Sequence, residues 1–106
     1  MAKFLVTANY TSEGAKALHE EGGTKRSQAA EQAIVSVGGK MEAFYFALGV
    51  HDAVIIADLP DAVSAAALSV AIAASGRVHI DTTPLLTPAE MDQACAKKTT
   101  YRAPGA

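Results

Sequence analysis

The chain is poor in cysteine, in aromatic residues and in net charge. Its single cysteine, Cys95, cannot form an internal disulfide, and a zinc site of four cysteines is excluded. Lysine and arginine number 9 against 11 acidic residues, so the basic excess typical of a nucleic-acid binder is missing and no such partner is expected. No spacing of potential ligands indicates a metal site, and no cofactor is expected.

Long hydrophobic runs are also missing. The least polar stretch, residues 62–75, is interrupted by Ser64 and Ser69 and is too short to span a bilayer. The N-terminal apolar run is broken by Thr7 and Asn9, which argues against a signal peptide. We therefore expect a cytoplasmic protein without membrane contact. Its 106 residues, half of them apolar, predict a single domain over residues 1–106.

The order of predicted elements indicates an α+β fold. Alternating side chains predict strands at residues 3–10, 40–48, 53–59 and 78–83, with Pro84 ending the last strand. Helical spacing and capping residues predict helices from residue 12, interrupted at Gly22 and Gly23, then over 25–37, 62–75 and 88–97. Residues 98–106 are expected to be an irregular arm. This β-α-β-β-α-β order with an extra C-terminal helix is that of a ferredoxin-like plait.

The alternation also assigns side chains to the two faces of the sheet. Phe4, Val6 and Ala8, together with Tyr45 of the second strand, are expected to face the helices, where small alanines let helices approach closely. The other face carries large apolar groups, including Phe44 and Phe46, which a monomer would expose to solvent. We therefore expect a homodimer in which two such faces pack as an α/β barrel around a shared cavity. The polar residues assigned to that cavity are Asn9, Glu42, Asp58, His79 and Asp81.

Several stretches of the chain resemble the GYD-domain family of small bacterial and archaeal proteins. They are residues 11–14 (TSEG), 22–26 (GGTKR), 38–46 (GGKMEAFYF) and 58–61 (DLPD), and the likeness covers nearly the whole chain. The family is named for a Gly-Tyr-Asp element after the second strand. Here that loop contains Gly49, His51 and Asp52, so His51 departs from the family pattern. The resemblance implies a dimeric α/β barrel related in shape to small monooxygenases and lactone isomerases, with no settled activity.

Few residues are candidates for chemistry. His51, His79 and Glu42 are the candidate catalytic residues, as groups that transfer protons. His79 and Asp81 project to the same side of a strand, and with Glu42 they form either a titratable cluster or a solvated edge. The candidate ligand-binding residues are Asn9, Phe44, Phe46, Asp52, Asp58 and Asp81.

Each of these candidates also has a structural interpretation. Asp52 is equally a turn residue that bonds backbone, and the two phenylalanines equally suit an interface core. Residues 22–26 begin a helix with two cations, but they lack the spacing of a phosphate-binding loop and favour a plain helix break.

Three functions remain open at this point. The preferred one is a homodimer that binds a small, partly apolar molecule in the barrel cavity, because it requires least of individual residues. The second is a cofactor-free oxygenase or isomerase using His51, His79 or Glu42 for proton transfer. The third is a structural subunit of a higher oligomer, suggested by the nearly all-apolar helix at residues 62–75.

Overall fold

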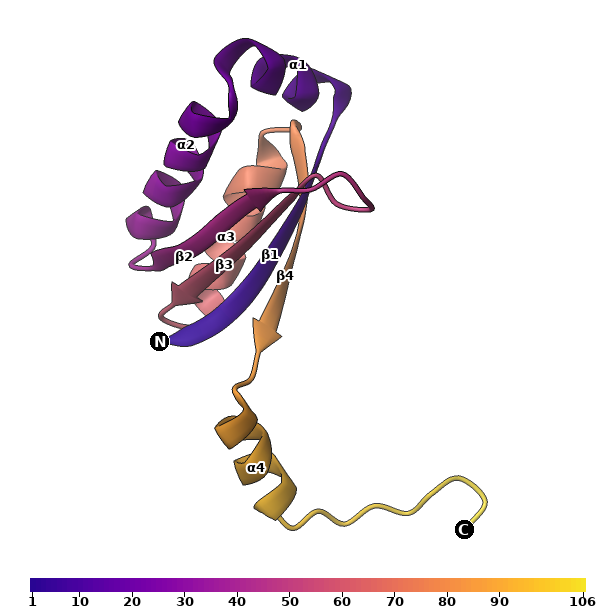
Figure 1. Cartoon of the computed structure of the whole chain (residues 1–106). Coiled ribbons are helices and arrows are strands. Elements are labelled where there is room, and N and C mark those ends of the chain that lie inside the picture. The colour runs from indigo at the N-terminus through magenta and orange to yellow at the C-terminus, as the bar shows by residue number, and fades with distance from the viewer.

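The computed structural model describes all residues, Met1–Ala106, and is built on a four-stranded antiparallel sheet of order β2-β3-β1-β4. One face of the sheet is covered by helices, with α3 behind the strands and α2 along β2 (Figure 1). The α+β prediction is confirmed, and the arrangement is compatible with a ferredoxin-like plait. The elements are β1 (Ala2–Tyr10), α1 (Ser12–Glu21), α2 (Gly23–Ser36), β2 (Lys40–Phe46), β3 (Ala53–Leu59), α3 (Ala62–Ala74), β4 (Val78–Leu85) and α4 (Pro88–Ala96).

Side-chain caps determine where the helices begin. The Thr11 hydroxyl accepts a hydrogen bond from the Gly14 amide, and the Asp61 carboxylate accepts one from the Ser64 amide at 2.7 Å. Thr87 forms a reciprocal capping box at the start of α4. The predicted break between α1 and α2 is also present, because Gly22 adopts a φ of 85°, which glycine takes without steric cost.

A β-bulge at Glu42 reverses the faces predicted for the part of β2 that follows it. Glu42 has no partner in the pairing of β2 with β3, and as a result Phe44 pairs with the buried Ile55. Phe44 and Phe46 therefore face the helices, where their rings meet edge to face with centroids 5.0 Å apart. The prediction that they lie on the uncovered face is wrong, because one extra residue shifts the two-residue alternation of a strand. Tyr45, predicted to face the helices, lies on the uncovered side instead.

The fourth strand also differs from its prediction. It continues through Pro84 to Leu85 instead of ending at residue 83. Proline removes one backbone donor, which is tolerated here because β4 is an edge strand of the sheet.

The hydrophobic core lies between the sheet and the helices α2 and α3. As predicted, Phe4, Val6 and Ala8 are buried there. Ile34 of α2 and Leu68 of α3 pack over them, with 2% and 3% of their surfaces exposed. The core therefore belongs entirely to the helix-covered face of the sheet.

The single chain exposes a large area for its size. Its accessible surface is 7378 Å², whereas a folded monomer of this mass exposes about 5,600 Å². Part of the excess comes from α4 and residues 97–106, which extend away from the domain and are exposed throughout (Figure 1). None of the helices has both the length and the apolar character needed to cross a membrane.

Candidate functional site

An ion triad occupies one end of the uncovered sheet face. The Lys3 ammonium donates to Glu42 at 2.6 Å and to Asp58 at 3.1 Å. These hydrogen bonds, first that to Glu42, raise the pKa of Lys3 above its ordinary value. Glu42 and Asp58 thus come together, as partners of a lysine that the sequence reasoning did not single out.

A second polar group lies at the other end of the same face. His51 Nδ1 is 3.0 Å from Asn9 Oδ1, and Asn9 Nδ2 donates to the Val50 carbonyl at 2.7 Å. His79 is the register partner of Asn9 on β4, and Asp81 follows two residues later on the same face. Three predicted residues, Asn9, His51 and His79, therefore gather at this end.

The predicted cluster of Glu42, His79 and Asp81 does not form. Glu42 lies on β2 and the other two on β4, which are the opposite edges of the sheet. Three interstrand steps of about 4.8 Å separate these edges by roughly 14 Å. No group of three or more histidine, cysteine, aspartate or glutamate side chains is arranged to hold a metal ion.

Asp52 fastens the loop between β2 and β3 to the end of β1. Its carboxylate accepts a hydrogen bond from the Tyr10 amide at 2.9 Å, and its own amide donates to the Ala8 carbonyl at 2.9 Å. Its carbonyl accepts from the Ala47 amide at 2.8 Å. Asp52 is therefore a positioning residue for Tyr10, whose side chain points to the helix-covered face.

That face contains an apolar cavity of about 390 Å³ between the sheet, α2 and α3. Sixteen of its 20 lining residues are hydrophobic, and its volume falls in the range of small-molecule sites. Alanines form much of the two helical walls, including Ala30 and Ala33 of α2 and Ala71 of α3, while Phe44 and Ile55 belong to the sheet side. The short side chains of these helical alanines border the hollow.

The cavity also has a few polar lining groups, among them Tyr10, Arg26 and Arg77. Burial, as the largest contribution, raises the pKa of Tyr10. A tyrosine phenol is protonated at neutral pH in any case and can donate a hydrogen bond. Arg26 lies 3.4 Å from the Glu21 carboxylate. Of the predicted ligand-binding residues, only Phe44 lines this cavity. The only feature of the sequence that points to the cavity is the alanine content of the two helices that line it. Alanine content by itself does not distinguish closely packed helices from helices that border a hollow.

The fold defines an α+β protein with an uncovered sheet face on one side and an apolar cavity beneath the helices on the other. The model of the GYD domain family matches residues 4–95, and the chain belongs to this family. The match extends from β1 into α4, so it includes every element that builds the cavity and the sheet. No match to the chain was found among curated proteins or among solved structures.

Proposed function

We propose that the protein is a homodimer that binds a small, partly apolar molecule in the cavity between α2 and α3. The observation that carries the proposal is the cavity itself, with its volume of about 390 Å³ and its hydrophobic lining. The apolar atoms that line this hollow are accessible to solvent, and removing apolar surface from water is favourable. A ligand of matching shape achieves this, and ligand sites in proteins are accordingly concave and mostly apolar.

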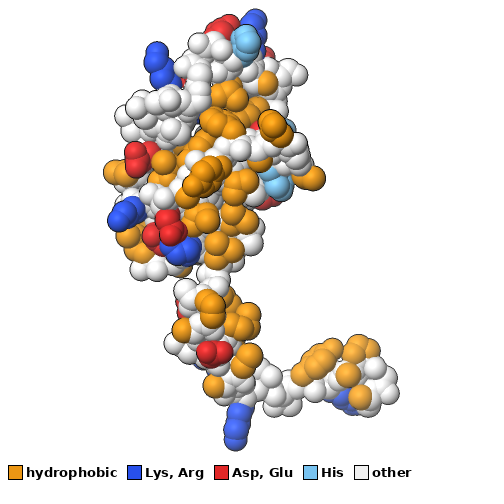
Figure 2. Space-filling view, in the orientation of Figure 1, with side chains coloured by type: hydrophobic (Ala, Val, Ile, Leu, Met, Phe, Trp, Pro, Cys, Tyr) orange, Lys and Arg blue, Asp and Glu red, His pale blue; other side chains and the backbone are white.

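The uncovered sheet face supports the homodimer. Six apolar side chains lie on it, and Tyr45 among them is 71% exposed. Figure 2 shows apolar side chains grouped across this face, with charged groups beside them. Monomers rarely leave such a patch in solvent, and a two-fold contact covers it on both copies at once. The six side chains are Leu5, Ala43, Tyr45, Val54, Ile56 and Leu85.

The geometry gives less support to proton-transfer catalysis. Glu42 is paired with Lys3 at one end of the sheet face, while His51 is held by Asn9 at the other. No two of the three candidate catalytic side chains are hydrogen-bonded to each other, and none lines the apolar cavity.

A cavity-filling substitution tests the proposed site. In Ala33→Phe the new ring projects into the hollow from α2, so binding of the neutral apolar dye Nile red should fall at least tenfold. Val35→Phe is the matched control, because Val35 is 58% exposed on the same helix and does not line the cavity. Fluorescence titration measures both affinities. Equal dye binding by Ala33→Phe and the unsubstituted protein, or no binding by the latter, would refute the site.

A further inference from the structure

The charged groups of the α2–α3 cavity lie at one end and have one sign. Arg26 is in the first turn of α2, and Arg77 immediately precedes β4. The beginning of α2 and the beginning of β4 both lie toward α1 (Figure 1). The same cavity extends to Val37, eleven positions along α2 from Arg26, which corresponds to about 16 Å of helix. No acidic residue lines it, so the hollow is cationic at one end and apolar along the remainder.

The backbone of Arg77 is held in place by α1. Its carbonyl accepts a hydrogen bond from the Thr11 amide at 2.9 Å. Gly14 packs so closely on this carbonyl that a Cβ there would lie 2.0 Å from the oxygen. The guanidinium of Arg77, in contrast, is in no ion pair, and that of Arg26 reaches only the Glu21 carboxylate at 3.4 Å. Both arginines line the cavity, and their guanidinium groups retain unused hydrogen-bonding capacity.

We infer that the molecule bound in this cavity is a small apolar carboxylic acid, with its carboxylate held by Arg26 and Arg77. This inference rests on the proposed function, since it names the chemical class of the ligand for the same site. Paired guanidinium groups suit a carboxylate because each offers parallel N–H donors to its two oxygens. Tyr10, whose amide is anchored by Asp52, supplies a further neutral donor at this end. The hydrocarbon part then lies between the alanine-lined walls.

Octanoate and octanol test this assignment, because they share an eight-carbon chain and differ in the charge of the head group. Titrations followed by protein NMR at neutral pH give both affinities and locate the site through the amide shifts of Ala33 and Ala71. Octanoate should bind at least tenfold more tightly than octanol, as expected for charge-assisted hydrogen bonds. Arg26→Met and Arg77→Met keep most of the aliphatic stem and should each weaken octanoate about tenfold while leaving octanol unchanged.

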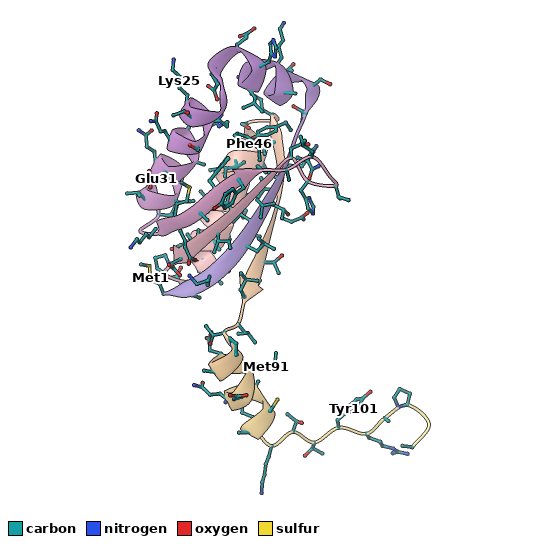
Figure 3. All side chains as sticks on the ribbon, in the orientation of Figure 1. Met1, Lys25, Glu31, Phe46, Met91 and Tyr101 are labelled. Atoms are coloured by element: carbon teal, nitrogen blue, oxygen red, sulfur yellow. The ribbon has the colours of Figure 1, made fainter.

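Lys25→Met is the matched control. Lys25 is adjacent to Arg26 but is exposed and does not line the cavity, and Figure 3 shows it on the outer side of α2. Its substitution should leave both affinities unchanged. Equal affinities for octanoate and octanol, with shifts in the cavity, would refute the carboxylic acid while leaving the apolar site standing. Equal losses in Lys25→Met and Arg26→Met would also refute it, as a general charge effect. Absence of cavity shifts with either compound would refute the proposed site itself.

Discussion

Replacing Gly14 by alanine should destabilise the protein, although the same change in most helices has the opposite effect. Alanine is favoured over glycine within a helix by as much as about 1 kcal/mol. Here, however, the added Cβ would meet the Arg77 carbonyl oxygen at 2.0 Å, whereas ordinary contacts begin near 3.4 Å. The obstacle is backbone and not the end of a flexible side chain. The start of α1 must therefore move away from the backbone of Arg77.

That movement weakens two hydrogen bonds. Thr11 donates through its amide to the Arg77 carbonyl at 2.9 Å and through its hydroxyl to the Gly76 carbonyl at 3.2 Å. Each bond contributes about 1 kcal/mol, and overpacking adds about 1–3 kcal/mol. After subtraction of the helix-propensity gain, the free energy of unfolding should fall by about 2–4 kcal/mol. For a domain of this size the melting temperature then drops by roughly 10 °C or more.

Thermal and urea unfolding followed by circular dichroism, at one fixed protein concentration, measure this change. Gly23→Ala is the control, because its Cβ would meet only the ring of Phe46, which is 43% exposed and able to move. We expect that control to lie close to the unsubstituted protein. If Gly14→Ala raised the melting temperature as helix propensity alone predicts, the close approach of α1 to Arg77 would be wrong.

Two further predictions concern the sheet face and the start of α3. Ile56→Lys places a charge on the uncovered face and should shift the protein toward single chains in sedimentation, whereas Val35→Lys on the outside of α2 should not; equal mass distributions would contradict the dimer. Hydrogen bonding by the Ser64 amide holds the pKa of Asp61 below its ordinary value of 3.8. The resulting stabilisation is complete above that value and is lost as the pH falls through the lowered pKa. In unfolding curves the difference from Asp61→Asn should therefore shrink under acid; a constant difference would contradict this linkage.

Local chemistry made much of the fold predictable from the sequence. The caps at Thr11, Asp61 and Thr87 mark helix starts because their oxygens satisfy amides that the first turn leaves unpaired. The alternation in β1 and β3 likewise identified a face that is buried in the structure. Both the helix starts and the buried face of these strands are determined by residues that lie within a few positions of each other in the sequence.

The remaining features depend on neighbours that are distant in the chain. The bulge at Glu42 is defined against the register of β3, so the sequence of β2 alone shows an uninterrupted alternation. The separation of Glu42 from His79 follows from the strand order, which places β2 and β4 at opposite edges. The cavity depends on the spacing of α2 and α3, which alanine content does not determine.

The two outer strands of the sheet carry features that discourage it from growing sideways. Pro84 leaves β4 without one backbone donor, and the irregularity at Glu42 disturbs the regular hydrogen-bond pattern of β2. A further strand from another molecule would therefore find a poor template at either rim, and open-ended, fibril-like stacking is disfavoured. The homodimer that we propose uses the broad side of the sheet instead, where two-fold symmetry would end the assembly at a pair.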